Sequence, residues 1–487
     1  MKKLQNFGIK GKIFNIIRGI YSNDSACVKI GNMRTESFTI NQGVRQGCVL
    51  SPLLFNIFLA DLAKELSSIS HKLKVGNEAI NSIFWADDIV LLGETEENLK
   101  EMLNLVNTYC CANKLTINCK KTKCLIFNKT GRLLRTKFSL NGKELENVRT
   151  YKYLGFIFTP SGEIRTGLED LRDRALKAFY SLKNKLGNAF YRNIPTSLSL
   201  FDSLIKPILL YASDFWGTLK LPVNNPIENL QMRIFKELLG VNKKTTNIGV
   251  LLELGRTSLN INAVKLGLKN WERVRKGEAN AILVASYKDA MDENLSWIQG
   301  VKGYLQRNGL LTLFLNEYPE APYFIHKKVY GIMVDQFHQN AFSTIRNPES
   351  KLRTYALIKT GIGMEKYLLE SKNVKTRVNY TKFRLSSHNL MIETGRYKKL
   401  KPEERVCPFC PKATEDEMHF LLDCYMYSSI RDSLLGKVLE ENYFFQFFRR
   451  EQKFQYLLTR YSHEVSNFIS KGFELRDFLL QCPKRCE

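Results

Sequence analysis

The sequence predicts an α+β protein, and three patterns in its 487 residues support this fold class. Short apolar runs flank an acidic turn at residues 80–92, which is typical of a β-hairpin. From about residue 165 onward, apolar residues recur at three- and four-residue spacing, which indicates helices. Hydrophobic residues make up 44% of the chain and charged residues 25%, as in ordinary core-forming proteins. A mixed first third followed by a helical remainder is therefore expected.

Two helices are predicted in the first third. Ser51 as N-cap and Pro52 at the first helical position begin one of them. Thr95 is the expected N-cap of the other. The apolar face of the first helix holds Leu54, Phe58, Leu62 and Leu66. The apolar face of the second holds Leu99, Met102, Leu103, Val106, Tyr109 and Cys110.

Strands are expected between and after these helices. One strand is predicted over Lys123–Phe127, and Asn141-Gly142 is a strong signal for a two-residue hairpin turn. A last strand is predicted over Tyr151–Phe158, ending before Pro160.

The rest of the chain reads as helical. One helix carries Leu168, Leu171, Ala175, Phe179, Leu182 and Leu186 on one face. Another, near residues 227–239, ends at Gly240, a typical C-cap residue. The domain boundaries that we predict are 1–160, 161–260, 261–370, 371–430 and 431–487. No motif in 261–370 suggests a chemical role.

The charge balance indicates a polyanionic partner. Lys and Arg number 73 against 48 Asp and Glu, which gives a formal net charge of +25. Such an excess attracts nucleic acid and supplies phosphate contacts, although a merely solvated basic surface is the alternative. No uncharged apolar stretch is long enough to cross a membrane. The cysteine clusters do not form a secreted disulfide framework, so we expect an intracellular protein, in either nucleus or cytoplasm.

Asp87 and Asp88 are the candidate catalytic residues. Adjacent side chains of a regular strand point to opposite faces, so both carboxylates can reach one site only at a turn. Carboxylates are ligands that Mg²⁺ prefers, and two such ions can stabilise the attacking and leaving oxygens of nucleotidyl transfer. The alternative is a solvated hairpin turn, in which Asp is common.

A glycine-containing segment precedes the helix that begins near Ser51. Gly43 and Gly47 allow the backbone to approach a ligand closely. Arg45 and Gln46 lie between them and can reach a phosphate or a base edge.

Four potential metal ligands near the C-terminus have the spacing C-x2-C-x8-H-x4-C: Cys407, Cys410, His419 and Cys424. Thiolates and an imidazole in a set of four suit one tetrahedral, structural Zn²⁺ with no position left open for catalysis. The alternative is four unconnected buried residues. The loop has little apolar area to bury, so zinc binding is expected to supply its stability.

A basic stretch spans residues 371–405. Its cations lie among aromatic residues, a pattern that suits single-stranded RNA through phosphate pairing and base stacking. A solvated basic surface is again the alternative. The candidate nucleic-acid-binding residues are Arg384, His388, Arg396 and Lys398.

The order of these motifs resembles the palm of reverse transcriptases from non-LTR (LINE-like) retrotransposons. The matching segments are Q-G-V-R-Q-G-C-V-L-S-P at 42–52, A-D-D at 86–88, K-T-K at 121–123 and Y-L-G at 153–155. Residues 209–217 and 238–241 resemble the thumb of these enzymes more weakly, and the Cys/His cluster resembles the knuckle of many such proteins.

The resemblance implies an RNA template, a DNA primer and a role for each motif. Asp87 and Asp88 would be metal ligands, and Arg45, Gln46 and Gly47 would lie against the incoming nucleotide or template. Lys121 would serve the nucleotide phosphates or a leaving-group proton. Tyr153, Leu154 and Gly155 would lie near the primer end.

One departure from the family pattern affects the metal site. These enzymes also need a metal-binding Asp on an earlier palm strand, but Asp24 and Glu36 are the only acidic residues before Gly43. Both follow the first helical segment, on the wrong side for that role. We therefore expect an N-terminally truncated polymerase with a partial palm, no fingers and an incomplete two-magnesium site.

Three readings of the function remain open at this point. One is a polymerase fragment that is active only if the missing acid is supplied elsewhere. Another is an inactive nucleic-acid-binding remnant that uses the thumb, the basic stretch and the knuckle. The third is a relic that does not fold stably. The sequence does not indicate whether activity is retained, nor the oligomeric state.

Overall fold

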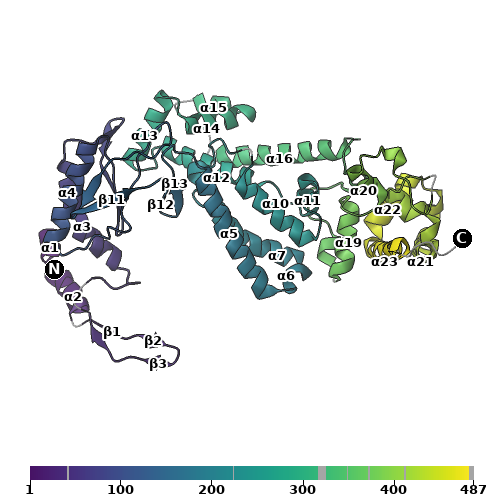
Figure 1. The fold of residues 1–487 in the computed structure, drawn as a ribbon, viewed down its shortest axis with the longest axis horizontal. Helices are drawn as coiled ribbons and strands as arrows, with labels where there is room; N and C mark the ends of the chain where they lie inside the picture. Colours follow the sequence, from purple (N-terminus) through teal and green to yellow (C-terminus); the bar gives the residue numbers. More distant parts are fainter. Residues whose placement is uncertain are drawn as a thin grey trace. The chain divides into compact units, whose positions relative to one another are not determined.

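The computed structural model describes residues 1–22, 24–40, 43–222, 224–315, 325–347, 349–370, 373–410 and 413–481. The chain divides into two compact units, whose elements are labelled in Figure 1. The first unit comprises Met1–Lys152, Phe158–Glu163 and Val274–Asn294. The second comprises Tyr153–Ile157, Ile164–Arg273 and Leu295–Glu487.

The helices of the first unit enclose its core. They are α1 (Lys2–Asn6), α2 (Gly11–Tyr21), α3 (Ser51–Ser68), α4 (Glu96–Ala112) and α13 (Ala281–Asp292). Helices α3 and α4 pack side by side (Figure 1). Leu62 and Leu66 of α3 and Met102 of α4 are fully buried between them. The predicted face of α4 is confirmed except at Leu99, which is only half-buried.

The two predicted N-caps had different outcomes. The Thr95 hydroxyl oxygen accepts a hydrogen bond from the Asn98 backbone N–H, so Thr95 caps α4 as predicted. Ser51 is not the cap of α3, because Leu50 occupies that position and Ser51 is already helical. The Ser51 hydroxyl instead donates to the Arg45 carbonyl at 2.5 Å and so fixes the segment before the helix.

Most strands of the first unit form two-stranded antiparallel sheets. These pair β1 (Ser25–Ala26) with β4 (Phe38–Thr39), β2 (Lys29–Ile30) with β3 (Met33–Arg34), β5 (Leu73–Val75) with β6 (Glu78–Ile80), and β7 (Ser82–Trp85) with β8 (Asp88–Leu91). A three-stranded sheet has the order β10-β11-β9, with β9 (Lys123–Cys124), β10 (Phe138–Leu140) and β11 (Lys143–Asn147). Strand β9 runs parallel to β11 and is shorter than the predicted Lys123–Phe127.

The turn predicted at Asn141-Gly142 is confirmed. Asn141 (φ 53°) and Gly142 (φ 71°) both adopt the left-handed conformation, which matches a two-residue turn between twisted strands. The register Leu140↔Lys143 leaves only these two residues between β10 and β11.

The single strand predicted over Tyr151–Phe158 is wrong. The segment forms two short paired strands, β12 (Tyr151–Tyr153) and β13 (Phe156–Phe158). Leu154 (φ 44°) and Gly155 (φ 82°) are both left-handed and reverse the chain between them. The continuous run of apolar and aromatic residues hid this turn, because Leu rarely adopts the left-handed conformation.

The described part of the second unit is mainly helical. Its first helices are α5 (Arg165–Leu186), α6 (Ala189–Arg192), α7 (Ile194–Leu200), η1 (Phe201–Ile205), α8 (Lys206–Leu209), α9 (Ser213–Trp216), α10 (Pro226–Leu239), α11 (Asn247–Glu253), α12 (Leu259–Arg275), α14 (Ser296–Arg307), α15 (Leu311–Leu315) and α16 (Ile325–Arg346). The later ones are α17 (Tyr355–Ile358), α18 (Tyr367–Glu370), α19 (Val374–Arg384), α20 (Met391–Tyr397), η2 (Pro402–Glu404), η3 (His419–Asp423), η4 (Tyr425–Tyr427), α21 (Ser428–Glu441), η5 (Tyr443–Phe447), α22 (Arg450–Arg460) and α23 (Ser462–Gln481).

Helices α5 and α10 lie against one another and confirm the predicted helical patterns (Figure 1). Of the predicted face of α5, Leu168, Leu171, Ala175 and Phe179 are buried. Helix α10 ends at Gly240, whose left-handed backbone (φ 68°) satisfies the last turn. A Cβ atom there would lie 2.8 Å from a methyl group of Val378, so both the backbone conformation and the packing require glycine. Within the described residues, no helix is both long enough and apolar enough to span a membrane.

Candidate active site and metal centre

Asp87 and Asp88 lie at the end of the β7–β8 hairpin. The register pairs Trp85 with Asp88, so Ala86 and Asp87 form the turn. Ala86 is left-handed (φ 52°), which allows the chain to reverse within two residues. Both carboxylates are exposed, and neither has a hydrogen bond or ion pair within the described residues. The predicted hairpin is confirmed, and its acidic pair is free to bind a cation.

The hairpin is anchored on the core between α3 and α4. Phe84 on β7 and Ile89 and Leu91 on β8 pack against the buried residues of those helices. The tip is therefore polar and exposed, while the strands behind it are fixed by apolar contacts. Such anchoring fixes where two carboxylates can present their oxygens to a metal ion.

The acidic pair lacks a third protein ligand within the described residues. There, the Cys/His cluster near the C-terminus is the only group of three or more potential ligands close enough to share an ion. Mg²⁺ commonly binds through one or two carboxylates together with substrate phosphates and water. The two exposed carboxylates offer oxygen ligands of the kind that such an ion takes.

Part of the segment at residues 43–47 is open to a ligand. Gly43 (φ 92°) and Gly47 (φ 80°) are left-handed, and no atom lies within 4 Å of a Cβ placed on either. Gln46 is exposed between them. Asn41 and Gln42, which belong to the same motif, lie outside the described residues.

Arg45 is held more tightly than its motif suggested. Its guanidinium lies 2.9 Å from the Asp24 carboxylate and donates to the Ile20 carbonyl at 2.8 Å. The Arg45 carbonyl accepts the Ser51 hydroxyl, so the residue is fixed at both ends. Arg45 is nevertheless exposed, so its contact with a nucleotide or template stays a prediction.

The remaining motif residues lie in both units. Lys121 follows α4 in the first unit, is exposed, and has no ion pair among the described residues. Tyr153, Leu154 and Gly155 belong to the second unit; Tyr153 ends β12, and Leu154 and Gly155 form the turn to β13. The Leu154 carbonyl accepts the Tyr211 hydroxyl, and the Gly155 carbonyl accepts the Arg174 guanidinium at 2.6 Å.

The four predicted zinc ligands converge in the second unit. The ligand atoms of Cys407, Cys410, His419 and Cys424 all lie within 4.8 Å of one another. The Sγ atom of Cys424 is 3.9 Å from that of Cys407 and 3.7 Å from that of Cys410. Zn–S bonds of about 2.3 Å in a regular tetrahedron place two sulfur atoms about 3.8 Å apart, so the cluster fits zinc.

The local backbone explains this convergence. The Cys407 N–H donates to the Ala413 carbonyl at 2.8 Å, and the Ala413 N–H donates to the Cys410 carbonyl at 2.9 Å, which closes a tight knuckle. The element η3 is a π-helical turn, in which the Cys424 N–H donates to the His419 carbonyl at 2.9 Å. That five-residue step brings the imidazole and the thiol to one side.

The protonation chemistry of the cluster also fits a metal centre. The His419 Nε2 atom is buried without a hydrogen-bond partner in the structure, a costly state that metal ligation would relieve. Burial lowers the pKa of His419, which favours the neutral ligand form. Burial also raises the pKa of Cys407 and raises that of Cys424 to about 12. A nearby divalent cation is what would stabilise the thiolates.

The cluster is not the isolated loop that the sequence suggested. Phe420, which lies between two of the ligands in sequence, is fully buried, and its ring packs at an angle against those of Tyr427, Phe468 and Phe473. The buried Glu415 carboxylate receives both arms of Arg476 on α23, at 2.7 and 2.8 Å. The expectation of negligible apolar burial is therefore wrong, because the knuckle forms one wall of a helical core.

The structure also corrects two of the four residues chosen from the basic stretch. Arg384 is buried and ion-paired with Glu253 and Glu365 at 2.6 Å each. His388 is buried with its Nε2 atom 3.0 Å from the Glu417 carboxylate. Neither side chain can contact nucleic acid, because each is buried and paired with an internal carboxylate. Arg396 and Lys398 are exposed, as predicted.

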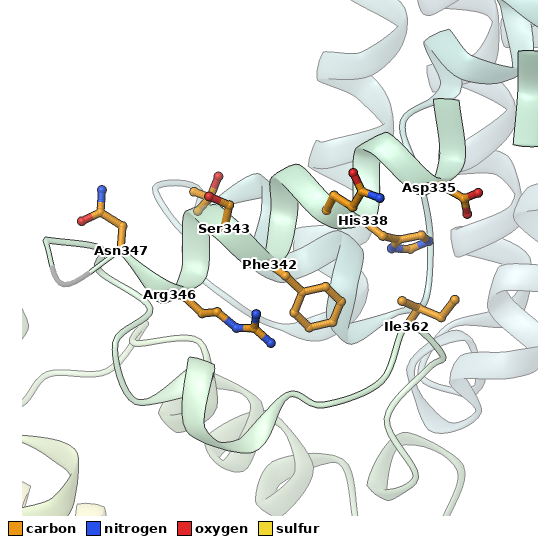
Figure 2. Close-up of a pocket in the computed structure, with 9 residues that line it drawn as sticks. Asp335, His338, Phe342, Ser343, Arg346, Asn347 and Ile362 are labelled. Carbon is orange, nitrogen blue, oxygen red and sulfur yellow. The ribbon is translucent and has the colours of Figure 1, made fainter. Parts of the chain in front are cut away.

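A large cavity elsewhere coincides with none of these residues. It has a volume of about 1050 Å³ and is lined mainly by one face of α16 together with Ile362. Figure 2 shows Asp335, His338, Phe342 and Arg346 along that helix. Burial lowers the pKa of His338. The cavity contains no set of three potential metal ligands within the described residues, so we assign it no chemistry.

The first third of the chain has known relatives. Residues 1–158 match the family model described as reverse transcriptase (RNA-dependent DNA polymerase). The chain is 29% identical over 219 residues to a Pol polyprotein of the R2 retrotransposable element of Popillia japonica, covering 43% of this chain and 30% of the relative. It is 26% identical over 241 residues to the RNA-directed DNA polymerase of the mobile element jockey of Drosophila funebris, covering 47% and 25%.

Residues 1–158 are therefore similar to the reverse transcriptase family. The R2 and jockey relatives confirm the resemblance, drawn from the motifs, to the reverse transcriptases of non-LTR retrotransposons. They do not favour the alternative of a catalytically inactive nucleic-acid-binding remnant. The chain matches about a third or less of the length of these two relatives.

Proposed function

We propose that this chain takes part in RNA-templated DNA synthesis, with Asp87 and Asp88 as metal ligands for nucleotidyl transfer. The observation that carries the proposal is the exposed, unpaired acidic pair at the tip of an anchored hairpin. The hairpin lies inside the segment that matches the reverse transcriptase family.

The carboxylates would supply oxygen ligands from one end of the hairpin. Magnesium bound there would neutralise phosphate charge and favour attack by the primer hydroxyl. Gly47 and Gln46 would contact the incoming nucleotide or the template, because their backbone is open to approach. The free ammonium of Lys121 would bind nucleotide phosphates. Arg45, which is exposed and held by Asp24, would contact the incoming nucleotide or the template beside them.

Two further assignments complete the proposal. Tyr153, Leu154 and Gly155 would contact the primer end, since Tyr211 and Arg174 hold their turn in one conformation. Cys407, Cys410, His419 and Cys424 would bind one structural zinc ion with all four positions filled by protein.

Catalysis would also require a carboxylate that the described residues do not bring to the acidic pair. A chimera with the jockey polymerase is designed to supply this carboxylate. In the chimera, residues 1–158 of this chain replace the aligned segment of the jockey polymerase. We expect template-dependent synthesis by the chimera, and its loss in Asp87→Ala and Asp88→Ala. Glu94→Ala is the matched control, because Glu94 is an exposed acid just beyond β8. A folded chimera that is inactive, or that tolerates Asp87→Ala, would contradict the proposal.

A further inference from the structure

A cationic surface in the second unit is assembled from three separate segments. Lys243 and Lys244 lie in the loop after α10, and Lys351 precedes α17. Arg396, Lys398 and Lys399 lie at the end of α20. We call these six residues the lysine surface. The basic stretch at 371–405 contains only the α20 part of this surface, because the other residues are about 45 to 155 positions away along the chain.

Hydrogen bonds hold the loop after α10 close to the start of the α20 segment. The Asn242 N–H donates to the Ser387 hydroxyl at 3.0 Å, and the Thr245 hydroxyl donates to the same oxygen at 2.9 Å. The Lys244 ammonium lies 4.7 Å from the centre of the Tyr397 ring. Lys244 is therefore held beside Tyr397, and Lys243 precedes it in the same anchored loop.

Three cationic side chains lie around a single carboxylate, that of Glu393. Glu393 is nearly buried and lies 3.3 Å from Lys351, 3.4 Å from Arg353 and 3.5 Å from Arg396. One carboxylate cannot neutralise three cations. Among the described residues, only Arg353 of these three cations also pairs with a second carboxylate, that of Glu417, at 2.8 Å. The surface therefore keeps a surplus of positive charge.

Carboxylates of the described residues do not neutralise the exposed lysines of the surface either. Lys243, Lys398 and Lys399 are exposed and form no ion pair within the described residues. The close approach of like charges also affects the pKa of a neighbouring lysine. Burial and the charge of Lys351 lower the pKa of Lys236, whose ammonium donates to the Lys243 carbonyl at 2.9 Å. Like charges this close repel one another, and a bound polyanion would relieve the repulsion.

The aromatic ring indicates which polyanion fits. Tyr397 is 64% exposed, and its ring lies beside Lys244 and next in sequence to Arg396 and Lys398. An exposed aromatic ring among lysines provides stacking for a base and contacts for the phosphates on either side of it. A duplex keeps its bases paired and would leave the ring unused, whereas a single strand uses both features.

We propose that the lysine surface binds a single-stranded polynucleotide, with phosphates on Lys243, Lys244, Lys398 and Lys399 and one base stacked on Tyr397. The inference rests on the proposed function, because it assumes that the chain handles nucleic acid. The surface involves neither the acidic pair nor the zinc ligands, so it adds a contact that the polymerase motifs do not contain.

The first test removes the charge. Lys243, Lys244, Lys398 and Lys399 are changed together to Gln, and binding of a labelled single-stranded oligonucleotide is measured by anisotropy as a function of salt. Each lost phosphate contact should reduce the log–log salt slope by about 0.7, so the slope should fall by up to about 2.8. The control changes exposed lysines on other elements, Lys288, Lys302, Lys366 and Lys471, to Gln. An equal loss in both variants, or none in either, would overturn the proposal.

The second test addresses the ring. Tyr397→Ala should weaken oligonucleotide binding about fivefold or more, whereas Tyr397→Phe should leave it unchanged, because stacking needs the ring and not the hydroxyl. Inorganic polyphosphate should bind Tyr397→Ala as well as the unmodified chain. Oligonucleotide binding that is insensitive to Tyr397→Ala would show a general polyanion surface and overturn the single-strand assignment. RNA and DNA strands are measured separately to identify the preferred backbone.

All binding is measured without magnesium and repeated with Asp87→Ala/Asp88→Ala. This design separates the two proposals. An inactive chimera beside intact oligonucleotide binding would count against the polymerase proposal alone, whereas an active chimera beside unaltered binding in the lysine variant would count against the lysine surface alone.

Discussion

The guanidinium of Arg384 lies 2.6 Å from the carboxylate of Glu253, 131 residues earlier in the chain, and both side chains are buried. Two tyrosine hydroxyls, from Tyr355 and Tyr367, donate to the same carboxylate at 2.7 and 2.6 Å. The pair links α11 to α19 and is a structural element of the second unit.

Glu253→Gln is expected to destabilise the second unit by about 3 kcal/mol. Removing one charge leaves Arg384 buried with Glu365 alone, and breaking a buried pair costs roughly 3–5 kcal/mol. Urea unfolding followed by tryptophan fluorescence measures the change. Lys375→Gln is the control, since its pair with Glu474 is exposed, and we expect a change of less than about 1 kcal/mol. Equal effects of the two substitutions would contradict the assignment.

The same pair predicts a pH dependence. Burial alone would raise the pKa of Glu253, but the charge of Arg384 and the tyrosine hydrogen bonds outweigh it and lower the pKa below 4.5. A lowered pKa stabilises the fold above the unfolded-state pKa, and this stabilisation is lost as the pH falls through the folded-state value. The free-energy difference between the unmodified chain and Glu253→Gln should be constant above about pH 5.5 and shrink below about pH 4.5. A free-energy difference between the two proteins that increases as the pH falls would contradict this prediction.

The metal centre predicts one zinc ion per chain. Cys410→Ser should reduce the zinc content from one to near zero, because the remaining three ligands cannot complete the tetrahedron. Native mass spectrometry after refolding with zinc measures the content. Cys27→Ser, at an exposed cysteine outside the cluster, should keep the metal. Equal zinc in both variants, or none in the unmodified chain, would show that the cluster does not bind zinc.

Chelation should loosen the region without unfolding it completely. Phe420, Leu421 and Tyr427 remain buried against neighbouring helices, so apolar packing supports the knuckle alongside the metal. Hydrogen exchange should therefore rise around residues 405–427 while α5 and α10 stay protected. Complete loss of protection throughout the second unit would contradict this description.

The turn of the acidic hairpin should tolerate glycine but not a β-branched residue. Ala86 is left-handed (φ 52°), a conformation that costs roughly 1–2 kcal/mol for residues with a Cβ. Ala86→Val should destabilise the first unit by about 1 kcal/mol or more, and Ala86→Gly should be neutral or stabilising. Ala79→Val on the exposed face of β6 is the control and should be neutral, because valine suits strands. The free energy of unfolding of the three variants, measured by chemical denaturation, tests this prediction.

Local signals in the sequence predicted much of the fold. The hydroxyl of Thr95, the turn at Asn141-Gly142 and the terminal Gly240 each act within a few residues, so their structures follow from neighbouring sequence. The metal ligands were also found because their spacing is short. Helical periodicity correctly placed the buried faces of α4 and α5.

Long-range pairing was not predictable in the same way. Arg384 and His388 read as surface cations because Glu253 and Glu417, which neutralise them, are remote in the chain and no local pattern points to them. The helical core around Phe420 depends on α23, some 50 residues later, so the knuckle seemed isolated. The lysine surface likewise depends on how three segments meet at Glu393 and Ser387.

The central claim is that Asp87 and Asp88 bind catalytic metal but that the described residues do not complete the site. Primer extension by the purified chain on an RNA template, with Mg²⁺ or Mn²⁺, tests it most directly. The expected result is no template-dependent incorporation above that of Asp87→Ala/Asp88→Ala, because nucleotidyl transfer rests on metal positioning and charge neutralisation. Template-dependent incorporation that Asp87→Ala abolishes would contradict the claim and show that another acid of this chain completes the site.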